Sequence, residues 1–508
     1  MVQAAAVFSS HMVLQQGKRI AVFGTGASGE TVTVTIPEMK ISVTGRVRTD
    51  GTWKVYLPAL EGGLSLTMTV SDAEHSQEFT DVVTGEVWLA GGQSNMEFFL
   101  KNAKGGAEEL KQCHKANVRC YNVYRNIFKG EDFEEIERTN SWKCASEENA
   151  GEWSAVAYWA AKELSERLGL PVGIIGCNLG GTSASCWMPK EDLLLHRETE
   201  PYWTDYEKAI AGRSDAEMIA DYDAYTEYHT AWEKRMQACY QENGNMKWTE
   251  VIERCGENRW PGPMNIKNPL RPSGTYECML SRVSPYTIRG FWYYQGENDD
   301  HRPDTYYTLL TTMIGRWRKD WEEETLPFLL TMLPVFCYED APDAQNWCMI
   351  RETQLRVYQN LRNTGIAVPL ELGEFNNIHP TDKKPVAHRV ALQAMALVYG
   401  GSEQEAFGPI YRDFSVEGNT LTLHFDHAEE GLVLTGDGAG FALAEAEGAY
   451  VPAKAEICGS SVHLTAEGVA APARARYAWK NFTPVSLYGT NGIPAAPLRT
   501  CRTEAWDV

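Results

Sequence analysis

The serine at position 94 lies in residues 91–97, Gly-Gly-Gln-Ser-Asn-Met-Glu, directly after a short apolar stretch. Such a turn can hold a serine at the start of a helix, where backbone N–H groups face the negative charge that develops on an ester carbonyl. The pattern differs from the Gly-x-Ser-x-Gly turn of α/β-hydrolases, since Met96 occupies the second glycine position. A serine in such a turn commonly serves as a helix N-cap, so Ser94 on its own defines no nucleophile.

Two further polar segments also follow apolar stretches. Residues 178–183 read Asn-Leu-Gly-Gly-Thr-Ser, and a glycine pair lets the backbone approach a ligand and turn an N–H toward it. Residues 292–300 read Trp-Tyr-Tyr-Gln-Gly-Glu-Asn-Asp-Asp, where the amide of Gln295 can donate to an oxyanion. The acids Glu297, Asp299 and Asp300 fit helix capping or solvent exposure equally well.

A histidine stands in a fourth polar segment, residues 374–383, Glu-Phe-Asn-Asn-Ile-His-Pro-Thr-Asp-Lys. Because Pro380 follows it, His379 is expected in an extended loop ahead of the next helix and not inside that helix. A loop imidazole has an ordinary pKa near neutrality and is suited to act as a general base. Alone, such a residue is more typical of a plain polar contact.

The elements that carry these segments alternate between strand and helix from residue 84 to about 402. Apolar strands that run into glycine turns begin near residues 85, 172 and 288, and a further strand is predicted at 328–333. Helical spacing is found at residues 155–168, 306–321, 350–361 and 385–399. This alternation predicts an α/β fold with right-handed βαβ units and a parallel sheet covered on both faces. Ligands bind at the carboxyl ends of such strands, where the three glycine turns fall.

Two β regions flank this core, and one insertion interrupts it. Residues 1–83 alternate in the manner of a small β-sandwich, with Asp50-Gly51 as a hairpin signal. Residues 403–508 return to the β pattern. Residues 190–265 contain a long polar, aromatic-rich helical stretch, which favours a solvated helical hairpin over a wall of the cleft.

The four polar segments, in this order, resemble the SGNH-hydrolase branch of sialate O-acetylesterases and related carbohydrate acetylesterases. The motifs are Gly-Gln-Ser-Asn-Met at 92–96, Gly-Gly-Thr at 180–182, Trp-Tyr-Tyr-Gln-Gly-Glu-Asn at 292–298 and Ile-His-Pro-x-x-Lys at 378–383. The resemblance spans nearly the whole chain except the insertion. It implies an SGNH (flavodoxin-like) three-layer α/β/α core with a parallel sheet, between the N-terminal and C-terminal β-sandwich regions.

The resemblance also implies a role for particular residues. Ser94 would be the nucleophile and His379 its general base. The oxyanion hole would consist of the Ser94 N–H, the N–H of Gly181 and the amide of Gln295. No metal ion and no cofactor is implied.

One position departs from the general pattern of these hydrolases. They usually carry an aspartate three residues before the histidine, and Asn376 occupies that place here. An acid orients the imidazole and stabilises its charged form. Three alternatives stay open: Asn376 orients His379 without charge, a carboxylate such as Glu374 or Glu297 takes the role, or Ser94 and His379 act as a dyad.

Charge and cysteine usage limit the partners and the compartment. Lys and Arg number 47 against 68 Asp and Glu, a net charge of −21, which disfavours nucleic acid and membrane surfaces as partners. The first residues lack the basic start of a secretory signal, and the 12 cysteines include no Cys-x-x-Cys pair. Both features favour free thiols in the cytoplasm. The oligomeric state cannot be predicted from these features.

These observations predict a serine esterase that removes acetyl groups from sugar hydroxyls without a metal. The substrate is expected to be a small acetylated sugar or oligosaccharide, either sialic acid or an acetylated xylo- or manno-oligosaccharide. The net charge disfavours the anionic sialic acid at long range. The alternative is a catalytically decayed SGNH protein that binds glycans through its β domains. A metalloenzyme fits worst, because the 11 histidines are scattered and no His-Glu-x-x-His occurs.

Overall fold

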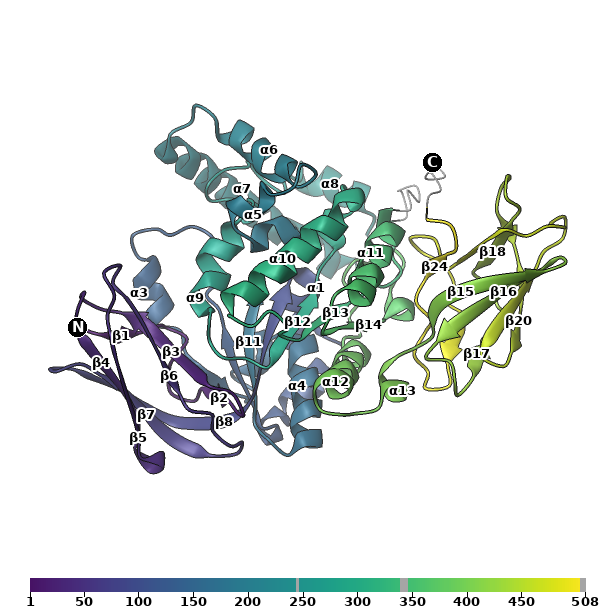
Figure 1. The fold of residues 1–508 in the computed structure, drawn as a ribbon. Helices are drawn as coiled ribbons and strands as arrows, with labels where there is room; N and C mark the ends of the chain where they lie inside the picture. Colours follow the sequence, from purple (N-terminus) through teal and green to yellow (C-terminus); the bar gives the residue numbers. More distant parts are fainter. Residues whose placement is uncertain (244–245, 339–345, 503–508) are drawn as a thin grey trace.

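A parallel sheet lies at the centre of the computed structural model, which describes residues 1–243, 246–338 and 346–502 (Figure 1). The strand order is β10-β9-β11-β8-β12-β13-β14, and only β10 runs antiparallel to its neighbour. The strands are β8 (Ser76–Gly92), β9 (Val118–Asn122), β10 (Lys143–Cys144), β11 (Val172–Asn178), β12 (Gly290–Tyr294), β13 (Phe328–Thr331) and β14 (Thr364–Ala367). Every residue of β11 to β14 is buried, as expected for strands covered on both faces.

Different helices cover the two faces of this sheet, as the alternating side chains of β12 show. Trp292 stacks on Trp88 of β8 with ring centroids 5.1 Å apart, and the Trp88 indole donates to the Tyr399 hydroxyl, directly after α12. Phe291 and Tyr293 point the other way and meet Trp317 of α10 edge-on. The main helices are α4 (Ala155–Leu168), α10 (Tyr306–Asp320), α11 (Asn346–Asn360) and α12 (Lys384–Val398). The predicted mixed α/β fold and these four helices are thus confirmed.

The N-terminal region is joined to the core by one continuous strand. The first half of β8 pairs with β7 and β2, and its second half lies in the central sheet, so the predicted boundary after residue 83 falls within this strand. One sheet contains β1 (Gln3–Ala4), β3 (Ile20–Thr25) and β6 (Thr52–Leu57). The strands attached to β8 are β2 (Val13–Gln15), β4 (Thr31–Ile36), β5 (Ile41–Arg46) and β7 (Ser65–Ser71).

The turn at Asp50-Gly51 forms, and the Arg48 N–H donates to Thr52 O across it at 2.8 Å, but the strands on either side do not pair as the predicted hairpin. Gly51 has a φ of +80° and its N–H donates to Arg48 O, whereas β5 pairs with β4 and β6 pairs with β3. A side chain at Gly45 of β5 would lie 2.5 Å from Val55 of β6, so the two strands pack face to face. The turn therefore carries the chain from one sheet to the other.

The C-terminal region is built from short antiparallel strands on the far side of the core from the N-terminus (Figure 1). Its sheets follow the orders β15-β16-β21-β20, β17-β23 and β19-β18-β22-β24. The strands are β15 (Ile410–Glu417), β16 (Thr420–Asp426), β17 (Leu432–Leu434), β18 (Phe441–Ala444), β19 (Val451–Pro452), β20 (Lys454–Cys458), β21 (Ser461–Thr465), β22 (Arg474–Tyr477), β23 (Leu487–Gly489) and β24 (Leu498–Arg499).

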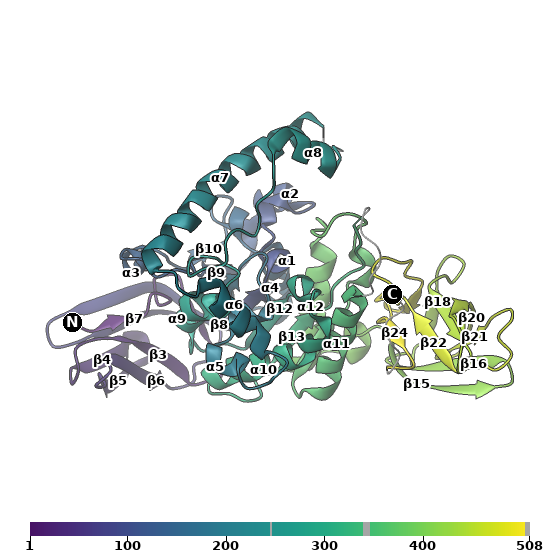
Figure 2. The same ribbon diagram turned by 90° about the horizontal axis from the view of Figure 1, so that it is seen from above.

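The insertion is helical, and its longest helix stands away from the sheet (Figure 2). It contains α5 (Lys190–Leu193), α6 (Glu200–Ile210), α7 (Asp215–Glu242) and α8 (Trp248–Cys255). Ser214 begins α7 with a capping box to Glu217. A small core of its own, centred on Trp232, joins α7 to α8. The chain then returns to the core after residue 255.

Within the described ranges, no helix combines the length and apolar character that crossing a bilayer requires. All 12 cysteines lie in the described ranges, and none of them forms a disulfide.

Candidate active site

Ser94 and His379 meet at the carboxyl end of the central sheet. The Ser94 Oγ lies 2.8 Å from His379 Nε2, although 285 residues separate them in the chain. Ser94 begins the short helix α1 (Ser94–Glu97) immediately after β8, and His379 lies in the loop between β14 and α12. Both side chains are partly exposed, so a ligand can reach the pair. The structure thus brings together the two residues that sequence reasoning placed at the centre of the site.

A glycine makes this turn possible. Gly92 has a φ of +133°, and a side chain there would come within 2.1 Å of the Tyr294 carbonyl oxygen on β12. Only glycine accommodates both the backbone conformation and the close approach. The next residue, Gln93, fastens the turn: its N–H donates to Tyr294 O at 3.1 Å, and its side-chain oxygen accepts from the Asn298 N–H at 3.2 Å.

Two backbone N–H groups beside this pair are free to bind a ligand. Ser94 is the first residue of its helix, and its N–H makes no hydrogen bond to the described part of the chain. In the glycine pair, the Gly180 N–H is engaged by Glu97 Oε2 at 2.6 Å. The Gly181 N–H, on a residue with a φ of +74°, has no such partner among the residues that the structure describes. Of the two glycines, Gly181 is therefore the one with an available donor.

Gln295 lies in the same cluster, but its amide is fully engaged. Its Nε2 donates to Thr182 O at 3.2 Å and to Asp299 Oδ2 at 2.5 Å, and its Oε1 accepts from the Tyr306 hydroxyl at 2.9 Å. The side chain is completely buried. No free N–H of Gln295 faces the site in this arrangement, so its role as a donor stays a prediction that requires one bond to be exchanged.

Asp299 is not the capping or surface residue that the sequence allowed. It is completely buried and accepts from Ser183 Oγ at 2.6 Å, from the Ala184 N–H at 2.9 Å and from Gln295. Burial raises the pKa of this carboxyl, which the three donors partly offset. Together with Gln295 it ties the segment after Gly181 to the end of β12. Sequence reasoning missed this role because nothing in the local pattern shows that residues 183 and 299 are in contact.

The third member of the site stays open. His379 Nδ1 makes no hydrogen bond to any residue in the described ranges. Glu374 instead accepts from the Asn377 amide at 2.8 Å, and Glu297 accepts from the Asn95 amide at 2.6 Å. The Asn376 N–H donates to Cys337 O, with a φ of +58° that asparagine tolerates well. The described geometry is that of a Ser–His pair.

A buried lysine beside the histidine was not foreseen, although its motif was noted. Lys383 is 1% exposed, and its Nζ donates to Asn95 Oδ1 at 2.5 Å. The Asn95 amide also donates to Ile378 O at 3.0 Å, which joins the helix of Ser94 to the loop of His379. Burial lowers the pKa of Lys383 to about 8. Burial and the charge of Lys383 together lower the pKa of His379 to about 4.

The site can therefore accept a proton and hold negative charge. At neutral pH His379 is uncharged and in hydrogen-bond contact with a hydroxyl group, while two free backbone N–H groups lie at the ends of the adjacent strands. Burial raises the pKa of Glu297, whose second carboxyl oxygen has no hydrogen-bond partner.

The comparisons with known proteins point to esterases. Residues 262–392 match the family described as carbohydrate esterase, sialic acid-specific acetylesterase. A solved carbohydrate acetylesterase from Xanthomonas citri covers 99% of this chain and 100% of its own length, at 27% identity and a TM-score of 0.77. The chain is a carboxylic-ester hydrolase.

Within that class the resemblance to sialate O-acetylesterases is confirmed. The chain is 25% identical to the sialate O-acetylesterase of Homo sapiens, over 80% of this chain and 73% of that protein. It is 22% identical to the one from Rattus norvegicus, over 98% of this chain and 94% of that protein.

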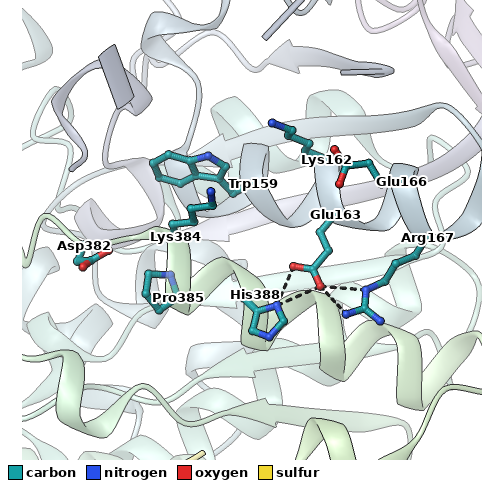
Figure 3. Close-up of a pocket in the computed structure, with 9 residues that line it drawn as sticks. All are labelled: Trp159, Lys162, Glu163, Glu166, Arg167, Asp382, Lys384, Pro385 and His388. Carbon is teal, nitrogen blue, oxygen red and sulfur yellow. Dashed lines mark hydrogen bonds and ion pairs between the residues drawn. The ribbon is translucent and has the colours of Figure 1, made fainter. Parts of the chain in front are cut away.

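A separate groove of about 750 Å³ lies between α4 and α12 (Figure 3). Its lining is mostly charged, and the Glu163 carboxylate lies between His388 and Arg167. Neither Ser94 nor His379 lines it. The groove is therefore not part of the candidate active site.

Proposed function

We propose that the protein is a serine esterase that removes O-acetyl groups from carbohydrates through an acetyl-enzyme intermediate. The observation that carries this proposal is the 2.8 Å contact between Ser94 Oγ and His379 Nε2 beside two free N–H groups. That the acyl group is acetyl and the alcohol is a sugar is inferred from the names of the relatives.

In the proposed reaction His379, neutral because of its low pKa, takes the proton of Ser94 as the hydroxyl attacks the ester carbonyl. The N–H groups of Ser94 and Gly181 receive the oxyanion, with Gln295 as the predicted third donor. Collapse of this intermediate breaks the bond to the sugar oxygen, which leaves with the proton from His379. Water, activated by the same imidazole, then releases acetate and restores Ser94.

The finer fold assignment belongs to the same proposal. An SGNH three-layer core in residues 84–402, with the insertion at 190–265, is supported by a parallel sheet that has α10 on one face and the end of α12 on the other. β-Sandwich regions at 1–83 and 403–508 are supported by the separate small sheets on either side. The substrates proposed are O-acetylated sialic acid or acetylated xylo- and manno-oligosaccharides.

Replacing the serine tests the proposal. We expect Ser94→Ala to lower acetate release from acetylated sugars and from 4-nitrophenyl acetate by at least about 10³-fold, with an unchanged circular dichroism spectrum. The wild-type protein, and not the variant, should be labelled by a fluorophosphonate at Ser94. Near-normal turnover in the variant would exclude this serine as the nucleophile. A wild-type protein that neither reacts nor turns over would favour a decayed, glycan-binding protein.

A further inference from the structure

An exposed tryptophan borders the candidate oxyanion hole. Trp260 has 52% of its surface exposed, and its ring atom Cζ2 lies 3.3 Å from where a side chain at Gly181 would begin. Gly181 is the residue whose N–H is free to receive the oxyanion. An ester bound at this N–H therefore has the indole within reach of its alcohol part or its acyl part.

The loop that carries Trp260 is held in place by hydrogen bonds from a buried asparagine side chain. Asn268 is completely buried, and its Nδ2 donates to the carbonyl oxygens of Pro261 and Pro263, both at 3.1 Å. The Trp260 N–H donates to Asn258 Oδ1 at 3.0 Å, and the Gly262 N–H donates to Arg259 O at 2.8 Å. The indole is thus presented on a rigid turn, so that little conformational freedom is lost when a ligand stacks on it.

This turn belongs to the insertion, which sequence reasoning expected to be solvated. Most of the insertion fits that expectation, because α7 and α8 form their own small core away from the sheet. Its last residues instead return to the edge of the site. The insertion therefore reaches the edge of the site through Trp260.

The shape and charge of the groups around Gly181 and Trp260 indicate which kind of ligand fits there. An indole offers a flat apolar face that matches the C–H face of a pyranose ring. The acetyl group of a small ester covers too little area to use such a face. The nearest charged group on the glycine pair is the Glu97 carboxylate, which is bound to the Gly180 N–H.

Three cations near the site are already engaged. Arg125 contacts Glu97 at 3.5 Å and donates to Asn178 Oδ1 at 3.1 Å. Lys383 is buried and donates to Asn95. Arg259, next to the indole, lies over the Tyr228 ring at 4.0 Å and contacts Glu257 at 3.6 Å. Each of these three side chains already has a partner, so a sugar carboxylate finds no free cation among them.

We propose that Trp260 is a stacking platform for the sugar ring that carries the acetyl group, and that this ring is an uncharged pyranoside. This inference rests on the proposed esterase function and names its substrate class. It assigns the insertion a part in substrate recognition.

Steady-state kinetics with three substrates test it. These are acetylated xylobiose, O-acetylated sialic acid and trifluoroethyl acetate, whose alcohol has no ring to stack. We expect Trp260→Ala to lower kcat/KM for acetylated xylobiose by about tenfold, mainly through KM, and to leave trifluoroethyl acetate unchanged. Trp260→Phe should keep most of the activity. Trp248→Ala is the matched control, since Trp248 lies on α8 in the same insertion and is 45% exposed.

The outcomes separate the platform from the esterase function. An equal loss on trifluoroethyl acetate would show that Trp260 only supports Gly181, and no loss on any substrate would exclude the stacking contact. Faster turnover of acetylated sialic acid than of acetylated xylobiose by the wild-type protein would overturn the uncharged class. A wild-type protein that is inactive on each of the three esters would refute the esterase function. Calorimetric titration of xylobiose into wild type and Trp260→Ala then measures the platform independently of turnover, and equal affinities would overturn it.

Discussion

At the scale of single residues, the low pKa of His379 sets the pH range of activity. Burial and the Lys383 charge lower this pKa to about 4, so the imidazole is neutral and able to accept the Ser94 proton at every pH above that value. Protonation below it removes the base. We therefore expect kcat/KM to fall on the acid side with a midpoint near pH 4 and to stay flat from about pH 5 to 8. A pH profile with trifluoroethyl acetate measures this, and a midpoint near 6.5 would contradict it.

A substitution of Lys383 tests whether its charge lowers the pKa of His379. Lys383→Met removes a positive charge close to His379, so the pKa of the imidazole should rise and the acid limb should move to higher pH. Burial still disfavours the imidazolium, so the shift should stop short of the ordinary value. Lys384→Met, an exposed neighbour on α12, is the control and should leave the limb in place. If both variants behave alike, the Lys383 charge does not act on His379.

At the scale of elements, the passage from β8 to α1 depends on Gly92. Alanine there would place its Cβ about 2.1 Å from Tyr294 O in a backbone region that side chains rarely adopt, so β8 and β12 must separate. We expect Gly92→Ala to lose about 1–3 kcal/mol of stability and at least about 10²-fold in kcat/KM, because Ser94 moves away from His379.

Gly169→Ala is the control for this variant. Gly169 ends α4 with a φ of +67° and has open space around it, so alanine there should cost about 1 kcal/mol without loss of activity. Thermal unfolding and steady-state kinetics of both variants give the comparison. Full activity in Gly92→Ala would show that the turn tolerates a side chain.

Local chemistry explains how much of these elements the sequence could predict. Buried strands that run into glycines are readable, because continuous apolar runs and positive-φ turns depend on neighbouring residues. Contacts between residues far apart in the sequence cannot be read in this way, because they depend on the tertiary arrangement. The examples are Asn95 with Lys383, Ser183 with Asp299, and Trp260 with Gly181. The turn at Asp50-Gly51 shows the same limit, because its local signal does not say whether the next strand pairs beside β5 or packs over it.

At the scale of the whole molecule, both flanking regions are anchored to the core by buried charges. In the C-terminal region, Arg499 of β24 forms a buried ion pair with Glu352 of α11 at 2.9 Å. Arg351 beside it donates to the carbonyl oxygens of Lys480 and Asn481. The N-terminal region shares β8 with the core and is held at Glu86. Such anchoring predicts that the flanking regions unfold together with the core.

Replacing Glu86 tests whether the N-terminal region unfolds together with the core. Its carboxylate is completely buried in β8 and accepts from Arg289 Nε at 2.6 Å, from the amides of Gln15 and Gln16 at 3.1 and 2.6 Å, and from the Tyr399 hydroxyl at 2.8 Å. Burial alone would raise its pKa, but these hydrogen bonds and the Arg289 charge lower it below the ordinary value. A lowered pKa in the folded state means that this stabilisation is present above about pH 4.5 and is lost as the pH falls further.

We therefore expect Glu86→Gln to lower the free energy of unfolding by about 2–3 kcal/mol at pH 7, because the Arg289 guanidinium loses its charged partner in a largely buried place. The difference from wild type should shrink as the pH falls below about 4.5, because Glu86 then becomes protonated in the unfolded wild-type chain, whereas its lowered pKa keeps it charged in the folded protein until lower pH. Glu456→Gln, which removes an exposed ion pair with Lys454, should leave the free energy of unfolding essentially unchanged. Calorimetry should show one transition that moves as a whole for Glu86→Gln, since β8 belongs to both regions. A first transition that moves alone would mean that the N-terminal region unfolds independently of the core.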